Sequence, residues 1–324
     1  MLFATRCSAR YLGCVTGAIS VATVYSMGRP MFNVYMAISG LVGGLLGFLG
    51  SLVDCRNGTL EQQLLRAIRR DGLMLVYQPV VDLANRQIVG AEALVRWTDE
   101  RGLAVPPDVL IRRAEERGFV GEITRLAVGH VLRDLGALLC SDPGFHVSVN
   151  VTAFDLAETG FEPMLEAALA QVGVRSESMT IEITESPTAR HERTIKTIRQ
   201  LRAAGHRVHI DDFGTGYSSL AYLQDLAVDG IKIDKVFTQA IGTNSVSVGI
   251  VPQILAMAEV LHLEIVVEGI ETEEQARYFV PADKPIRAQG WLFGKPVPAG
   301  EFLEMLAKER ENDCASVGEV CTLS

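Results

Sequence analysis

The chain has 324 residues, a formal net charge of -9 and 48% hydrophobic residues. This length suits one large domain or two small ones, and the mean hydropathy of +0.22 is high for a purely soluble protein. The negative charge argues against binding of long nucleic acid through a basic surface, although a small anionic substrate needs only a few local cations. The six cysteines form no CxxC pair, so the sequence predicts neither a disulfide framework nor a zinc ribbon.

The apolar excess lies at the N-terminus. Residues 11–27 and 31–53 carry no charge, and the second segment is long enough to span a bilayer, which takes about 20 residues. The first segment has three interpretations: a spanning helix, a signal-peptide core, or a buried helix of a soluble domain. Because no small-residue cleavage site follows it and a second apolar segment comes at once, we favour a two-helix hairpin that turns at residues 28–30. We therefore expect residues 1–56 to form an N-terminal transmembrane region.

Charge orients this hairpin. Arginines outside the two predicted helices outnumber the one between them: Arg6, Arg10, Arg56, Arg66, Arg69 and Arg70 against Arg29. Basic residues are retained on the cytoplasmic side of a membrane, so the rest of the chain is expected in the cytoplasm. Gly40 and Gly44, and Gly43 and Gly47, give two GxxxG spacings that would allow two helices to approach closely.

A linker helix is expected after the membrane region, within residues 57–72. Thr59 and Gln62 have the spacing of a capping box, and Leu60, Leu64 and Ile68 lie on one helical face. These features predict a helix over residues 60–70. We expect the main folded domain at residues 73–310 and a C-terminal tail at 311–324.

The remaining pattern alternates between strands and helices. Strands are expected at 73–81, 87–97, 146–151, 179–184, 207–211, 230–234, 264–268 and 285–289, and helices at 106–117, 122–139, 161–172, 188–204, near Leu220, and at 246–261, 272–279 and 299–308. Eight strands alternating with helices over about 250 residues fit an α/β fold of the (β/α)8 barrel type. An open doubly wound sheet is the alternative.

Polar residues at strand ends favour the barrel. Six of them interrupt or end apolar, strand-like segments: Glu92, Asn150, Glu182, Asp211, Lys232 and Glu268. In a barrel, the C-terminal ends of different strands converge on one mouth, whereas in an open sheet they would be spread out. Such side chains are costly to bury without partners, so their recurrence indicates a site.

The segment His209–Leu220 is the strongest single signal. An apolar strand ends in Asp211 and Asp212, and a glycine-containing loop follows. Adjacent carboxylates repel each other unless a cation neutralises them, and oxygen ligands suit magnesium or manganese, whereas zinc prefers His or Cys. The alternative is a solvated turn, because Asp and Gly are also common in turns for conformational reasons.

The same residues suggest a chemistry. A carboxylate shared between two ions is the geometry that activates a water and holds a phosphodiester for in-line displacement. Asp211, with Asp212 beside it, is the candidate for this shared ligand. Lys232 would orient that water or neutralise charge that develops in the transition state. Alternatively, Lys232 simply faces solvent at the end of its strand. The Arg96 guanidinium could bind a phosphate through two parallel N–H donors. Alternatively, Arg96 forms an ion pair at the barrel rim.

Other chemistries lack support in the sequence. His206 and His209 have an odd spacing on one strand, which turns them to opposite faces, so we interpret both as structural. The chain contains no GxSxG elbow, and the glycines at 214 and 216 match neither the P-loop nor the Rossmann pattern.

Several ordered motifs resemble one family, over about residues 60 to 310. They are Gln78-Pro79, Glu92–Trp97, Val149–Val151, Ile181–Ser186, Asp211–Leu220, Ile231–Asp234, Glu268–Thr272 and Ala288–Phe293. Together they are similar to the signature of the EAL-domain cyclic di-GMP phosphodiesterases. The resemblance implies a TIM-like barrel with an antiparallel first strand, which hydrolyses cyclic di-GMP to linear pGpG with two Mg²⁺ or Mn²⁺ ions.

The resemblance also implies residue roles. Glu92, Asn150, Glu182 and Asp211 match one metal site, and Asp211, Asp212 and Glu268 match a second. Lys232 matches the catalytic lysine, which acts with Glu92, Asp211 and Asp212. Gln78, Arg96, Asp234 and Gln289 match substrate-binding positions, and Glu185 and Glu271 match supporting acids. A homodimer in the bacterial inner membrane is the implied context.

The sequence departs from the family pattern at few positions, and two other functional interpretations compete with this one. Trp291 stands where many members have Tyr, Val267 where Ala is frequent, and residues 280–286 are irregular. Only residues 28–30 separate the two apolar segments, which leaves no room between them for a sensing domain. One rival is an inactive barrel that binds cyclic di-GMP as a receptor. The other is an unrelated metal-dependent barrel enzyme that acts on a small carbonyl or sugar substrate.

Overall fold

The computed structural model describes residues 42–45, 59–184, 192–214, 223, 225–243, 249–280 and 285–317. The chain divides into two compact units, of which the first comprises residues 1–69 and 99–103. In this unit α3 spans Leu60–Arg69, and the predicted capping box is confirmed: the Thr59 N–H donates to Gln62 Oε1 at 3.3 Å and the Gln62 N–H to Thr59 Oγ1 at 3.4 Å.

The predicted membrane region falls almost entirely outside the described residues. Of the expected spans 11–27 and 31–53, only residues 42–45 are described, and they are helical. Among the residues that the structure describes, no helix is both long and apolar enough to cross a bilayer. The transmembrane region and the orientation of the chain therefore stay predictions.

The second unit, residues 70–98 and 104–324, is a closed barrel. Its elements are β1 (Met74–Asp82), β2 (Ile88–Thr98), β3 (Ala104–Val105), α4 (Pro107–Arg117), α5 (Val120–Ser141), β4 (His146–Val151), α6 (Ala153–Ala157), α7 (Phe161–Val172), η1 (Ser176–Ser178), β5 (Met179–Thr184), α8 (Glu192–Ala203), β6 (Arg207–Phe213), β7 (Gly230–Ile233), α10 (Lys235–Ala240), α11 (Val251–Val260), β8 (Glu264–Val267), α12 (Glu273–Phe279), β9 (Ile286–Ala288) and α13 (Ala299–Val317).

Strand pairing closes the barrel through β1. The order is β1-β9-β8-β7-β6-β5-β4-β2, and β1 pairs with both β9 and β2 in antiparallel fashion, while the other neighbours in the ring are parallel. The short β3 extends the sheet beyond β2. The eight-stranded barrel with an antiparallel first strand is thus confirmed, and the open sheet is wrong.

Element boundaries differ from the predictions mainly at short elements. The elements β3, α6, η1 and α10 were not predicted, because six residues or fewer are too short for a helical or strand period to be recognised. The closing helix α13 continues to Val317, into the predicted tail. The short helix expected near Leu220 and the beginning of the helix expected at 188–204 lie largely outside the described residues.

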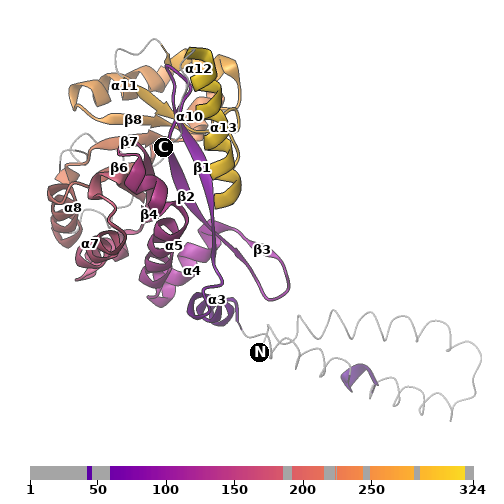
Figure 1. Cartoon of the computed structure of the whole chain (residues 1–324). Helices are drawn as coiled ribbons and strands as arrows, with labels where there is room; N and C mark the ends of the chain where they lie inside the picture. Colours follow the sequence, from indigo (N-terminus) through magenta and orange to yellow (C-terminus); the bar gives the residue numbers. More distant parts are fainter. Residues whose placement is uncertain are drawn as a thin grey trace, which may run out of the picture. The chain divides into compact units, whose positions relative to one another are not determined.

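Strand alternation places the polar residues inside the barrel. On β4, Val147, Val149 and Val151 are at most 2% exposed and belong to the hydrophobic core, which includes residues of α5. Because successive side chains of a strand point to opposite faces, Ser148 and Asn150 face the barrel interior. Helices cover the outside of the barrel, and α13 lies along β1 (Figure 1).

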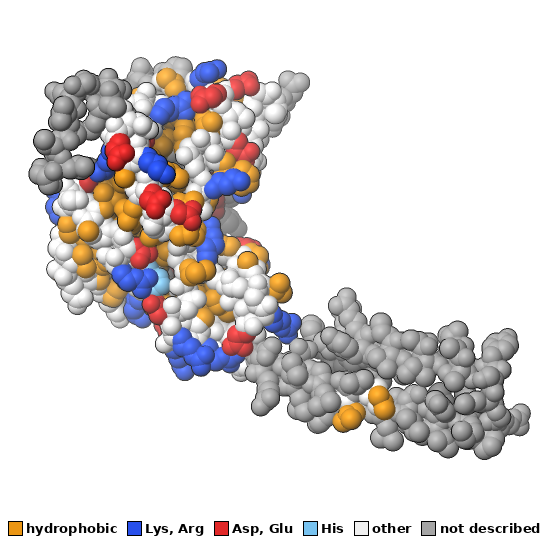
Figure 2. Space-filling model, turned by 45° about the vertical axis from the view of Figure 1, so that its right-hand side comes forward, with side chains coloured by type: hydrophobic (Ala, Val, Ile, Leu, Met, Phe, Trp, Pro, Cys, Tyr) orange, Lys and Arg blue, Asp and Glu red, His pale blue; other side chains and the backbone are white. Residues whose placement is uncertain are grey.

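The outer surface carries both signs of charge. On the face shown in Figure 2, Lys and Arg side chains are interspersed with Asp and Glu side chains and with hydrophobic ones. Mixed charges of this kind partly cancel at a distance, so charge that is concentrated inside the barrel matters more for a ligand there.

Candidate active site

Lys232 lies at the centre of the candidate site. This β7 residue has no exposed surface, and its Nζ is 2.8 Å from Glu182 Oε2, 2.8 Å from Glu268 Oε1, 3.2 Å from Asp211 Oδ1 and 3.3 Å from Glu92 Oε2. The carboxylates come from β2, β5 and β6 and from the position directly after β8. The predicted convergence of strand ends is therefore confirmed, and the solvent-facing interpretation of Lys232 is wrong.

Two side-chain amides connect these carboxylates. Asn150 Nδ2 donates to Glu92 Oε1 at 2.8 Å, while Gln289 Nε2 donates to Glu92 Oε2 at 2.7 Å and to Glu268 Oε1 at 2.9 Å. Gln289 Oε1 is buried and has no hydrogen-bond partner among the described residues. The family resemblance implies that Gln289 positions water or substrate, and the structure places its amide directly among the acids.

A local irregularity of β6 brings the adjacent acids together. Pairing with β7 shifts between Ile210 and Phe213, and Asp212 has a φ of 53°, in the left-handed region that non-glycine residues rarely adopt. The Asp212 N–H donates to Asp211 Oδ1 at 3.0 Å. A regular strand would point these two side chains to opposite faces, so the irregularity lets both carboxylates reach one site.

Burial and mutual repulsion shift the proton affinities of the acids. Burial holds the pKa of Glu182 well above its ordinary value and raises the pKa of Glu268 to about 8; the charge of Lys232 opposes this shift, and repulsion from neighbouring carboxylates adds to it. Burial, followed by repulsion from Asp211, raises the pKa of Asp212 to about 6. Burial acts on Glu92 too, but the charge of Lys232 and the two amide donors outweigh it and lower the pKa. One ammonium does not neutralise the whole cluster.

The acids form two overlapping groups with the dimensions of metal sites. Ligand atoms of Glu92, Glu182 and Asp211 lie within 4.8 Å of one another, and so do those of Asp211, Asp212 and Glu268. The donors are all carboxylate oxygens, to which Asn150 and the unpartnered Gln289 Oε1 add amide oxygens nearby. This donor set fits Mg²⁺ or Mn²⁺ better than zinc.

Two further residues that are predicted to bind substrate, Gln78 and Arg96, lie on β1 and β2. Gln78 is the direct cross-strand partner of Glu92, and its Nε2 donates to Gly294 O at 3.4 Å. Arg96 Nη1 donates to Val95 O at 2.9 Å, and burial lowers its pKa. The ion pairs among the described residues do not include Arg96, which disfavours its interpretation as part of a rim ion pair.

The other predicted positions have local structural partners. Asp234 is 7% exposed and caps α10, accepting a hydrogen bond from the Val236 N–H at 2.8 Å. The backbone N–H of Glu271 donates to Gln275 Oε1 at 2.8 Å, beside the capping box of α12. Glu185 lies outside the described residues, so its supporting role stays a prediction.

His206, directly before β6, and His209 on β6 lie on opposite faces, as predicted. His206 Nε2 is 2.6 Å from Glu166 Oε1 of α7, on the outside of the strand. His209 lies inside the barrel, where its Nε2 is 3.4 Å from Glu264 Oε2. Neither belongs to the two groups of metal-ligating atoms.

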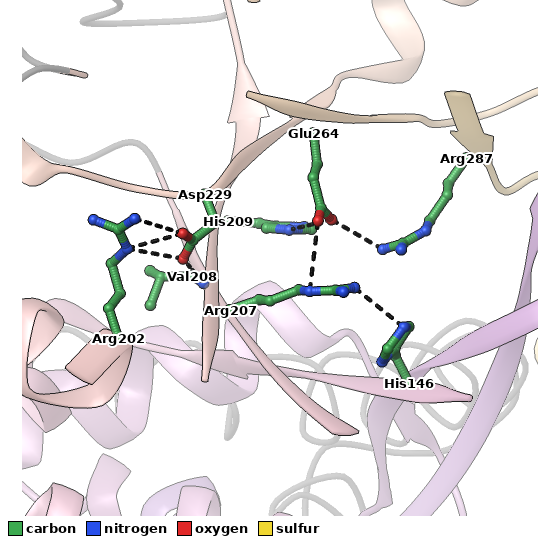
Figure 3. A network of polar contacts seen from close by, with 8 residues as sticks. All are labelled: His146, Arg202, Arg207, Val208, His209, Asp229, Glu264 and Arg287. Atoms are coloured by element: carbon green, nitrogen blue, oxygen red, sulfur yellow. Dashed lines mark hydrogen bonds and ion pairs between the residues drawn. The ribbon is translucent and has the colours of Figure 1, made fainter. Parts of the chain in front are cut away.

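A second charged network lies at the N-terminal ends of the same strands (Figure 3). Glu264 is 3.0 Å from Arg287 Nη1 and 3.5 Å from Arg207 Nε, in addition to its contact with His209. Arg207 Nη1 donates to His146 Nε2 at 3.1 Å. This network was not predicted from the sequence, where its one signal is a charged residue at the beginning of several predicted strands.

The network shifts the pKa values of Glu264 and His146. Burial would raise the pKa of Glu264, but His209 and the two arginines lower it to about 2. Burial and the same arginines lower the pKa of His146 to about 4. A cavity of about 30 Å³, enough for one or two waters, is lined both by His146 and Arg287 of this network and by Glu182 of the carboxylate cluster.

Comparison with known proteins identifies the family of the barrel. A model of the family described as "EAL domain" matches residues 61–296. The chain belongs to the EAL domain family. It is 38% identical over 265 residues to a probable cyclic di-GMP phosphodiesterase, PdeB, of Escherichia coli (82% of this chain, 50% of PdeB), and 36% identical over 253 residues to the cyclic di-GMP phosphodiesterase NbdA of Pseudomonas aeruginosa (78% of this chain, 32% of NbdA).

Solved structures agree with this assignment. The PaMucR phosphodiesterase in complex with c-di-GMP is 33% identical and superimposes with a TM-score of 0.67, covering 74% of this chain and 99% of that one. The cAMP-bound EAL enzyme Bd1971 gives a TM-score of 0.72 at 30% identity, covering 83% and 75%. The chain spans half or less of the length of the curated relatives named above, so those relatives contain regions that it does not match.

Proposed function

We propose that the barrel hydrolyses cyclic di-GMP to linear pGpG. The observation that carries the proposal is the buried cluster of four carboxylates around Lys232, which together with Asp212 form two overlapping groups that share Asp211. Membership of a family whose relatives include cyclic di-GMP phosphodiesterases supports the choice of substrate. An unrelated barrel enzyme that acts on sugars is disfavoured for the same reason.

The protein's own residues have distinct tasks in this reaction. Glu92, Asn150, Glu182 and Asp211 would hold one ion, and Asp211, Asp212 and Glu268 the other. Such ions supply charge neutralisation for the phosphodiester and activation of water. Lys232, fixed by four carboxylates, would orient the attacking water and balance developing charge. Arg96, Gln78, Asp234 and Gln289 would position the dinucleotide.

Product analysis tests the proposal. The full chain is incubated with cyclic di-GMP and Mg²⁺ or Mn²⁺, and the nucleotides are separated by chromatography. We expect conversion to pGpG, and no conversion by the Glu92→Ala variant. Binding of intact cyclic di-GMP without product would show instead that the barrel is an inactive receptor.

The cellular setting is part of the same proposal. Residues 31–53, which contain no charge, would anchor the chain in the bacterial inner membrane with the barrel in the cytoplasm. We further propose a homodimer, to which the GxxxG spacings of residues 40–47 would contribute. Membrane fractionation and the mass of the purified chain in detergent test these two statements; a chain that stays in the soluble fraction or is monomeric would contradict them.

A further inference from the structure

An exposed tryptophan lies in the turn that follows β9. Trp291 is 60% exposed, although its large apolar ring makes tryptophan one of the residues that proteins mostly bury. Lys295 Nζ is 4.7 Å from the centre of the ring, at the distance of a cation–π contact. The ammonium covers part of the ring, and the rest of the indole surface is accessible.

This turn is attached to the candidate active site at both ends. Two residues before Trp291, the Gln289 amide donates to Glu92 and Glu268. Three residues after it, Gly294 O accepts a hydrogen bond from the Gln78 amide at 3.4 Å. The indole is therefore carried by a segment that contacts the carboxylate cluster on one side and a predicted substrate residue on the other.

The backbone of the turn has little freedom to move. A Cβ on Gly290 would lie 2.0 Å from Ile270 O, so only glycine allows this close approach of the two segments. The Leu292 N–H also donates to Ile270 O at 3.0 Å. A rigid aromatic surface loses little conformational entropy when it binds a planar ligand.

Planar, anionic ligands match this arrangement. A base stacked on an aromatic side chain contributes a binding free energy that corresponds to about 10- to 100-fold in affinity, and it does so for any base because every base has a π-face. The ammonium of Lys295 adds a positive charge beside the ring, which favours a ligand that carries phosphates.

We propose that Trp291, with Lys295 against its ring, is a stacking surface for a guanine base of the substrate and sets substrate affinity in the hydrolysis proposed above. This inference rests on that proposed function for the identity of the nucleotide. Trp291 contacts neither Lys232 nor the carboxylates in any interaction of the described residues, so its effect falls on binding and not on the chemical step.

Steady-state kinetics of the full chain give the first test. Trp291→Ala should raise KM for cyclic di-GMP about 10- to 100-fold and change kcat less than threefold. Trp291→Phe should restore most of the affinity, because a benzene ring still stacks. The matched control is Tyr278→Ala on α12, another exposed aromatic residue, which should leave KM unchanged. An unchanged KM in Trp291→Ala, or a fall confined to kcat, would overturn the proposal.

Fluorescence gives a second test that does not require turnover. The chain contains two tryptophans, and Trp97 is only 4% exposed, so ligand-induced quenching should come from Trp291. We expect cyclic di-GMP, mixed with the protein in Mn²⁺ buffer and recorded before turnover, to quench wild-type emission but not that of Trp291→Phe. Quenching without hydrolysis would support the stacking surface while refuting the phosphodiesterase; hydrolysis with equal emission changes in both proteins would refute the stacking surface alone.

Discussion

At the C-terminal ends of the barrel strands one lysine is surrounded by four carboxylates, whereas at the N-terminal ends one carboxylate is surrounded by two arginines and a histidine. Lys232 and Glu264 are the central charges of these two networks. The two arginines more than compensate Glu264, so the N-terminal network is complete without a ligand. Lys232 is one cation among four acids, so the cluster still offers several carboxylate oxygens to a divalent cation.

The largest expected difference between the two ends is in catalysis. Asp211→Asn reduces the charge of the carboxylate shared by both groups of ligands, so kcat for cyclic di-GMP should fall at least about 1,000-fold. We also expect Mn²⁺ to raise the melting temperature of the wild type and not that of the Asp211→Asn variant. Glu264→Gln is the matched control: it makes the same chemical change at the other end and should retain both properties. Similar losses in both variants would remove the distinction between the two ends.

Removal of the central lysine should affect stability before a metal is added. Lys232→Ala leaves four buried acids without a cation, and breaking such a buried network costs about 3 kcal/mol of unfolding free energy. Because Mn²⁺ supplies the missing charge, it should recover part of this loss. Thermal unfolding of the full chain with and without Mn²⁺ measures both effects.

The kinetics of the same variant bear on the role of Lys232 in chemistry. We expect kcat to fall more than KM changes, because the lysine acts on the water and not on the nucleotide. An effect limited to KM, or equal stability of variant and wild type without metal, would contradict the central position of Lys232.

The smallest expected effect is the response of the N-terminal network to acid. The folded-state pKa values of Glu264 and His146, about 2 and about 4, are below their ordinary values of 4.5 and 6.5. The stability that these groups contribute is therefore complete above pH 6.5. The contribution of His146 is lost as the pH falls from 6.5 toward 4, and that of Glu264 as it falls from 4.5 toward 2. Glu264 is 36% exposed, so solvent screening reduces its share to about 1 kcal/mol. Urea unfolding of wild type and Glu264→Gln should converge as the pH is lowered; a constant difference would show that the ion pairs do not contribute.

Much of the candidate site follows from the sequence. Glu92, Glu182, Asp211, Lys232 and Glu268 each interrupt or end an apolar strand, and polar groups in such places are costly unless they meet one another. The eight strands also follow from the pattern of residues. The antiparallel position of β1 was inferred from the family resemblance, because local residue patterns do not specify which distant strands pair.

Tertiary structure alone decided how these groups meet. It buries Lys232 completely, although a lysine at the end of a strand is equally compatible with solvent, because burial depends on which strands are neighbours. It turns Asp212 toward Asp211 through an irregularity in β6 that no residue type announces. It assembles the network of Glu264 from residues far apart in the chain. The sequence by itself determined which groups carry charge and, where a strand is regular, which face of the strand each occupies; barrel closure determined their partners, since partners come from strands that the chain brings together only when it folds.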